Sequence, residues 1–353
     1  NLDNSNLLDR TDLSNINLAG TDLSNVSLKG KNLSGTTLTG VDLSYKDLTG
    51  ADLIDTILTG ADLTGTILRG ADLSGKDMKK TILKDADLSN ANLTGIDLSV
   101  KDLTGTILTW ANLSNTNFQY ANFDNTNLEN ANLTRASVVQ VDLTKIKNKS
   151  LAGANLFDTS FAHSNLSGVN LSGAILIATN FWKADLPGQD FTVISDTSAE
   201  AISFEESNLY NSNFEGVDLS PQKMFSHVFE NKAYLKILSD NEIVNDIFGE
   251  NQQILVLSTE VRGNDLAVSF VYFNNFKNAN LENTNFKNAK LLHANFYSAD
   301  LINADLSGAD LRKAILTDAN LSGANLSGAN LSGAIWDEST ILKCKNHPIC
   351  LND

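Results

Sequence analysis

The sequence predicts an all-β solenoid that carries a small α+β insertion. Three observations predict it: large apolar residues recur at nearly every fifth position from Leu8 to Leu143, the residue two places before each is usually small, and proline is rare, with 3 in 353 residues. Amphipathic helices repeat every 3.6 residues and half-buried strands every 2, so a sustained period of five fits neither. A closed coil with one five-residue segment per side satisfies the period, because the large residue fills the interior and the small one packs beside it.

The repeated segment has a recognisable form. It reads Ala51-Asp52-Leu53, Ala61-Asp62-Leu63, Ala71-Asp72-Leu73, Ala111-Asn112-Leu113 and Ala121-Asn122-Phe123. This A-[D/N]-L-x-x pattern resembles the pentapeptide-repeat family, and the resemblance covers most of the chain. It implies a right-handed quadrilateral β-helix with four pentapeptides per coil.

Register breaks divide the repeat. The period runs through residues 1–219, with breaks near 144–150, where extra residues must loop out or bulge, and near 192–203. It disappears over 220–273 and returns over 274–341 as a continuation of the same solenoid. Exposed ends of a β-solenoid need caps, and we expect the irregular residues 1–7 and a cysteine loop in 342–353 to supply them.

The segment 220–273 is expected to form a helix followed by a β-hairpin. Ser220 and Pro221 suit a helix start, and apolar residues then follow helical spacing as far as Leu238. A second short helix is expected from Glu242 to Phe248, and a hairpin from the alternating stretches on either side of Arg262-Gly263-Asn264-Asp265. The segment is either an insertion that packs back onto the solenoid or a partner-docking module. The candidate docking residues are Met224, Phe225, Phe229, Tyr234 and Arg262.

Lysine occupies positions where the pattern expects a small inward residue, at Lys31, Lys46, Lys76 and Lys101. Full burial of an unpaired ammonium would cost several kcal/mol. We therefore expect these side chains to extend outward to water, with a locally opened coil corner or pairing with a neighbouring Asp or Asn as alternatives.

An acidic column is expected on one face of the solenoid. Residues about 20 apart stack there, and the column includes Asp22, Asp42, Asp62, Asp102 and Asp142. Like charges about 4.8 Å apart repel, so the column must be screened by salt, bind cations or be neutralised by a basic partner.

Both cysteines lie near the C-terminus, at Cys344 and Cys350. We expect a short disulfide loop, which favours an oxidising compartment. A Cys-x-x-His-x-x-Cys metal site is the alternative, although it lacks a fourth ligand. The chain starts at Asn1 rather than Met, which fits a mature chain whose leader has been removed. We therefore expect an extracytoplasmic protein, with a cytoplasmic location as the alternative.

Composition limits the function. The net charge of -16 argues against direct binding to nucleic acid or an anionic membrane, and no apolar run approaches the roughly 18 residues of a membrane span. The four histidines form no metal pair or nucleophile constellation, and the carboxylates belong to the repeat, so we expect no enzyme, cofactor or metal.

We expect a non-catalytic structural or adaptor protein that presents a rigid acidic surface to a protein partner, and that could also associate head to tail or as another homo-oligomer. Two alternatives stay open. Some members of the family it resembles look like duplex DNA and bind DNA gyrase, which implies a DNA mimic. The flat hydroxyl-rich faces could instead bind carbohydrate, ice or cations, through residues such as Ser14, Ser24, Ser34, Ser44, Thr59 and Thr64.

Overall fold

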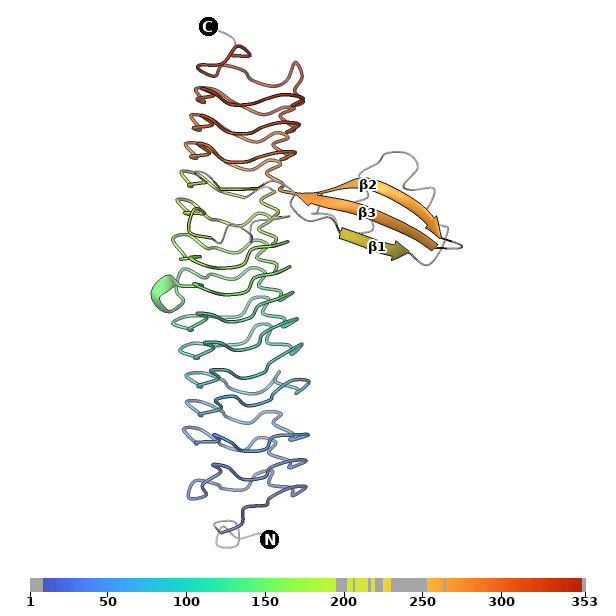
Figure 1. The fold of residues 1–353 in the computed structure, drawn as a ribbon. Helices are drawn as coiled ribbons and strands as arrows, with labels where there is room; N and C mark the ends of the chain where they lie inside the picture. The colour runs from blue at the N-terminus through green and yellow to red at the C-terminus, as the bar shows by residue number, and fades with distance from the viewer. Residues whose placement is uncertain are drawn as a thin grey trace. The chain divides into compact units, whose positions relative to one another are not determined.

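The structure is a computed structural model in two compact units, Asn1–Ala174 and Ile175–Asp353. It describes residues 9–194, 202–205, 207–214, 217–219 and 274–350, and the backbone of three strands between them. Figure 1 shows the stacked coils of each unit and the three strands of the insertion.

In the first unit, each coil consists of four five-residue sides. Parallel bridges join residues that are 20 apart, as in Asn92 to Asn112 and Asn112 to Asn132. The central residue of each side points inward, and Leu33, for example, is fully buried. The five-residue period therefore arises because one side of the coil has five residues and one of them fills the interior.

The sharp turn between two sides requires a left-handed backbone. Glycine, asparagine and aspartate occupy most of these corner positions, with φ values such as +66° at Gly40 and +57° at Asn115. These residues adopt the conformation at the lowest cost, so their recurrence beside the apolar period is a second signature of the fold.

Glycine is favoured at one corner of the first unit for two reasons, the backbone conformation and the space beside it. Gly65 has φ +61°, and a Cβ atom there would lie 2.5 and 2.6 Å from two ring carbons of Tyr45. Gly70 has φ +68°, and a Cβ atom added at Gly70 would have no atom within 4 Å. We expect Gly70→Ala to cost about 1 kcal/mol from backbone strain, and Gly65→Ala about 1 kcal/mol more because the ring must move.

Urea unfolding of the two alanine variants checks this expectation. Tyr45→Ala in the Gly65→Ala background should remove the difference between the two sites. If Gly65→Ala and Gly70→Ala lower the free energy of unfolding equally in the wild-type background, the contact with the Tyr45 ring does not affect stability.

The expected bulge near 144–150 is present. It contains the 3-10 helix η1, Lys147–Lys149, which stands out from the coils in Figure 1. The Lys147 amide still donates to the Thr126 carbonyl at 2.9 Å, and Ser150 rejoins the ladder opposite Asn170. Extra residues are therefore accommodated outside the coil without a change in the core.

In the second unit, the coil before the insertion pairs directly with the coil after it. Ser203 bridges to Asn275 and Asp218 bridges to Lys290. The buried Asn274 side chain closes the junction, since it accepts a hydrogen bond from the Ile202 amide and donates one to the Leu219 carbonyl, both at 2.8 Å. Phenylalanine fills this part of the core, where rings of Phe204 and Phe276 stack with centroids 5.1 Å apart.

The described part of the insertion is a three-stranded antiparallel sheet. Its strands are β1 (Phe225–Phe229), β2 (Gln253–Arg262) and β3 (Asp265–Phe273), with β3 in the middle. β2 and β3 occupy the two alternating stretches around Arg262 and Asp265. A register shift between Val256 and Ser258 interrupts their pairing.

The expected helix from Ser220 to Leu238 is wrong for Phe225–Phe229, which are extended and pair with Phe270 to Leu266 of β3. An apolar residue at both ends of a five-residue segment fits one helical turn and also fits an alternating strand, and pairing with β3 decides between them. The rest of that helix and the one expected from Glu242 to Phe248 lie outside the described residues.

Candidate functional site

The acidic column stabilises turns. Each of its five carboxylates accepts a hydrogen bond from the backbone amide two residues later, at 2.8 Å for Asp22 and Ser24, 2.9 Å for Asp42 and Ser44, 2.9 Å for Asp62 and Thr64, 3.0 Å for Asp102 and Thr104, and 3.0 Å for Asp142 and Thr144. This Asx geometry explains why Asp or Asn precedes the central residue in the repeat. Sequence reasoning placed the column but missed this role.

Hydrogen bonds lower the pKa of three of these carboxylates, Asp22, Asp42 and Asp102. The side chain and backbone of Thr104 lower the pKa of Asp102, and those of Ser44 lower the pKa of Asp42. Repulsion along the column is interrupted where Asp62 bridges to Ile82, and where the Asn122 amide donates to Asp102 at 3.3 Å.

Acid should therefore destabilise the first unit. The pKa of Asp102 in the folded state lies below the unfolded value of 3.8. The contribution of the ionised Asp102 to folding stability is therefore complete above pH 3.8 and is lost as the pH falls through the folded-state pKa. We expect the thermal midpoint to fall between about pH 4 and pH 2, because the Asp42 and Asp22 pKa values are also lowered.

Asp102→Asn provides the matched control for the acid effect, since Asn32 shows that an amide oxygen caps the same turn, at 3.0 Å from the Ser34 amide. This variant should lose less stability than the wild type on acidification. A thermal midpoint that falls equally in both proteins would show that Asp102 does not contribute to the loss of stability in acid.

The outward hydroxyls are also used within the fold. The Ser34 hydroxyl donates to Asn32 at 2.7 Å, and the Thr64 hydroxyl donates to Asp62 at 2.6 Å. The donor protons of these two hydroxyls are directed to the turn rather than to solvent, which weakens the basis for ice binding by a lattice of outward hydroxyls.

The expectation that the inward lysines extend to water is wrong for Lys31 and Lys101, which are 7% and 9% exposed. The Lys101 ammonium donates to the carbonyl oxygens of Met78, Lys79 and Thr81, at 2.7, 2.7 and 2.9 Å. These carbonyl oxygens converge at the coil corner and accept the protons of the ammonium, and the carboxylates of Asp77 and Asp97 add a favourable electrostatic interaction. The other three lysines also donate to carbonyls of the preceding coil: Lys31 to Arg10, Lys46 to Ser24 and Lys76 to Leu53.

The ladder between adjacent coils is interrupted at Lys46, Lys76 and Lys101, whereas beside Lys31 the bridge from Asp12 to Asn32 is kept. Among the described residues of the first unit, no bridge joins Asp52 to Asp72 or Ile57 to Asp77 beside Lys76, although Asp62 still bridges to Ile82. Likewise, no bridge among them joins Asp77 to Asp97 or Ile82 to Asp102 beside Lys101, or Asp22 to Asp42 beside Lys46. The alternative of a locally opened corner thus describes these sites.

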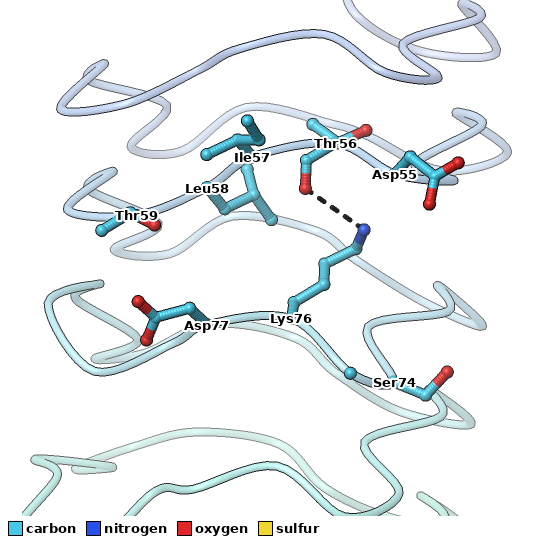
Figure 2. Close-up of a pocket in the computed structure, with 9 residues that line it drawn as sticks. Asp55, Thr56, Ile57, Leu58, Thr59, Ser74, Lys76 and Asp77 are labelled. Atoms are coloured by element: carbon cyan, nitrogen blue, oxygen red, sulfur yellow. Dashed lines mark hydrogen bonds between the residues drawn. The ribbon is translucent and has the colours of Figure 1, made fainter.

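A pocket of about 290 Å³ lies at the opening beside Lys76, between residues 55–59 and 74–77. Figure 2 shows the Lys76 side chain extending from its own coil to the Thr56 carbonyl, 3.3 Å away. Its second acceptor is the Leu53 carbonyl at 2.6 Å, and burial lowers its pKa. Because the ammonium is held by two carbonyl oxygens, we assign Lys76 a structural role in this pocket.

Cys344 and Cys350 form a disulfide, with their Cα atoms 4.9 Å apart, which confirms the predicted loop. The sulfur atoms are bonded to each other, and the His347 Nδ1 accepts a hydrogen bond from the Ile349 amide at 3.3 Å. Among the residues that the structure describes, no group of three His, Cys, Asp or Glu side chains could hold a metal ion.

The candidate docking residues of the insertion are partly placed. Phe225 and Phe229 are the ends of β1, and Arg262 ends β2 opposite Asp265 of β3. Met224 and Tyr234 lie outside the described residues. Within the described ranges, no helix has the length and apolar character needed to cross a membrane.

Bulky exposed side chains at left-handed corners are the feature that sequence reasoning missed. Tyr45, Val100, Trp110 and Tyr120 have φ between +52° and +60° and are 76%, 75%, 65% and 53% exposed. Their signal in the sequence is a large residue two places after the central one, where glycine, asparagine or aspartate is usual.

The chain is similar to several proteins of solved structure. Among solved structures, the chain is similar to HetL, involved in heterocyst differentiation regulation in the cyanobacterium Nostoc (24% identity, 95% of this chain and 90% of that one, TM-score 0.21). It is also similar to a pentapeptide repeat protein of the Arabidopsis thaliana thylakoid lumen (30% identity, covering 30% of this chain and 69% of that one, TM-score 0.23). A third similar structure is that of the plasmid-mediated fluoroquinolone resistance protein QnrB1 (16% identity, covering 77% of this chain and 92% of that one, TM-score 0.20). No curated protein matches the sequence.

The family model for pentapeptide repeats matches more than half of the chain. Pentapeptide-repeat proteins are generally non-catalytic, and their fold is the right-handed quadrilateral β-helix. The matched residues are 7–44, 47–85, 81–119, 111–147, 154–192, 275–308 and 294–333. The chain therefore belongs to the pentapeptide-repeat family.

Proposed function

We propose that the chain is a non-catalytic structural or adaptor protein that binds a protein partner through one corner of its first unit. The observation that carries this proposal is a change of residue type along that corner. Glycine occupies it at Gly20, Gly40 and Gly60, and Val100 and Tyr120 occupy it on two later coils, between Lys80 and Gln140.

The backbone conformation at Val100 and Tyr120 lowers the stability of the fold. Val100 has φ +52° and Tyr120 has φ +60°, a conformation that costs a bulky residue roughly 1–3 kcal/mol. Val100 is 75% exposed and Tyr120 is 53% exposed, so burial within the chain does not offset the strain. A partner that buries both side chains would offset it, which is why strained exposed residues suggest a binding role.

The corner is also held rigidly. The Val100 amide donates to the Gln119 carbonyl at 2.9 Å, and the Tyr120 amide donates to the Val139 carbonyl at 3.1 Å. Ile82, 48% exposed, lies on the next face of the preceding coil, and Lys101 fixes the turn beside it. We call Ile82, Val100 and Tyr120 the Val100 corner. A preorganised apolar surface of this kind loses little entropy on binding.

The insertion supplies a second proposed contact. Within the described residues, β2 is an edge strand, because only β3 pairs with it. Edge strands can accept a strand from a partner, and Arg262 lies at the end of this one. Phe225 and Phe229 of β1, with Met224 and Tyr234, stay proposed docking residues. The disulfide between Cys344 and Cys350 supports an extracytoplasmic location for this activity.

Affinity purification from an extract of the native source tests the proposal. The wild-type protein should retain one partner at near-stoichiometric amounts, and Val100→Gly/Tyr120→Gly should retain at least tenfold less. The double variant should fold normally, because glycine already occupies this corner at Gly20, Gly40 and Gly60. A chain with residues 220–273 replaced by a short linker measures the contribution of the insertion.

The same purification separates the alternatives. Equal recovery of one partner by all three proteins would overturn the Val100 corner and the insertion as docking sites. DNA gyrase in every purification would favour the DNA-mimic alternative, and absence of any retained protein would overturn the adaptor function.

A further inference from the structure

A single exposed indole lies among neutral amides on a different corner of the first unit. Trp110 is 65% exposed and has φ +60°. The same corner one coil before and one coil after carries Asn90 and Asn130, both with φ +59°. Asparagine adopts this conformation at a lower cost than tryptophan, so the indole is placed there with backbone strain.

The adjacent column continues the amide surface. Asn92, Asn112 and Asn132 are bridged in sequence, and each lies two residues after a corner residue. The Asn132 amide donates to the Asn112 oxygen at 3.1 Å, and the Asn112 amide donates to the Asn92 oxygen at 3.4 Å. This column carries aspartate on earlier coils, at Asp52 and Asp72, and is uncharged from Asn92 onward.

Hydroxyl groups extend the polar surface beside the amides. The Thr94 and Ser114 hydroxyls lie 3.3 Å apart, and the Asn112 amide also donates to Thr94 at 2.9 Å. These groups are half-buried and fixed to one another. The result is an array of mutually hydrogen-bonded amides and hydroxyls with an aromatic ring at its edge, and the Asp72 carboxylate borders it, accepting a hydrogen bond from the Asn92 side-chain amide at 3.0 Å.

We propose that Trp110 and the amides of Asn92, Asn112 and Asn132 bind a neutral saccharide chain. A sugar ring has an apolar C–H face, which stacks on an indole, and a rim of hydroxyls, which pair with amide donors and acceptors. The coils repeat about every 4.8 Å, comparable to the length of one sugar ring, so successive rings could meet successive amides. The neutral amides and the net charge of -16 select an uncharged glycan over an anionic one.

An array of neutral oligosaccharides, with sulfated and uronic-acid glycans as the charged comparison, tests this site. We expect binding to neutral glycans, and calorimetry then measures the affinity for the glycan that binds best. Trp110→Asn, which copies Asn90 and Asn130, should weaken that binding at least tenfold. Val100→Gly/Tyr120→Gly should leave it unchanged, and the tryptophan fluorescence change on binding should disappear only in Trp110→Asn.

Three outcomes would overturn the saccharide site. They are no binding to any neutral glycan at millimolar concentration, unchanged binding by Trp110→Asn, and a preference for charged glycans. Since the Val100 corner carries the proposed protein partner, loss of protein capture without loss of glycan binding, or the reverse, tells the two proposals apart.

Discussion

Replacement of Phe204 by alanine is expected to lower the free energy of unfolding of the second unit by about 3–5 kcal/mol. The Phe204 side chain is fully buried. Its ring stacks on Phe181 at 5.4 Å and on Phe276 at 5.1 Å, and meets Phe191 and Phe214 edge to face at 5.4 and 5.9 Å. A cavity at this position would remove contacts on both sides of a register break and an insertion.

Urea unfolding followed by circular dichroism measures the effect, with Phe204→Leu as the control. Leucine fills the central position on most sides of the coil, so this variant should lose only about 1 kcal/mol. Similar losses for alanine and leucine would contradict the proposed role of the ring stack.

Lys101→Met is expected to destabilise the first unit by about 3 kcal/mol. Methionine keeps the length of the side chain but has no proton for the three carbonyl oxygens that Lys101 bonds. The Met78 carbonyl keeps the Thr81 amide and hydroxyl as donors, whereas the Lys79 and Thr81 carbonyls lose the donor that Lys101 supplies, and unpaired buried acceptors are costly. The side chain would also keep the two coils apart, so the ladder could not close in compensation.

Lys101→Thr is the matched control, because threonine is a normal residue at this position. Thr106 and Thr116 each donate a hydroxyl to the carbonyl 23 residues earlier, at 3.1 and 2.9 Å, and both leave the ladder intact around them. We expect Lys101→Thr to be neutral or stabilising, with slower amide exchange at Met78 and Leu83. Equal destabilisation by methionine and threonine would contradict the carbonyl cage.

The solenoid could be predicted because its cause is local. One five-residue side needs one large inward residue, and Leu33 and Leu53 carry that information whatever the rest of the chain does. The bulge at Lys147–Lys149 followed from the same count, since three extra residues have no place inside a coil of fixed length.

Features that depend on contacts between coils were harder to predict. The carbonyl oxygens around Lys101 lie 20 to 23 residues earlier in the chain, and nothing in their residue types marks them as ligands of an ammonium. The strand Phe225–Phe229 is similar, because its pairing partner lies about 40 residues later in β3. The two corners proposed as binding sites could have been found from sequence, since Val100 and Trp110 replace the usual corner residues.

Photo-crosslinking tests the central claim most directly. A photoreactive phenylalanine is introduced at position 120 or, as the control, at position 110, and each protein is irradiated in an extract of the native source. A partner on the Val100 corner predicts one discrete protein adduct from position 120 and none from position 110. The same adduct from both positions, or none from position 120, would contradict it.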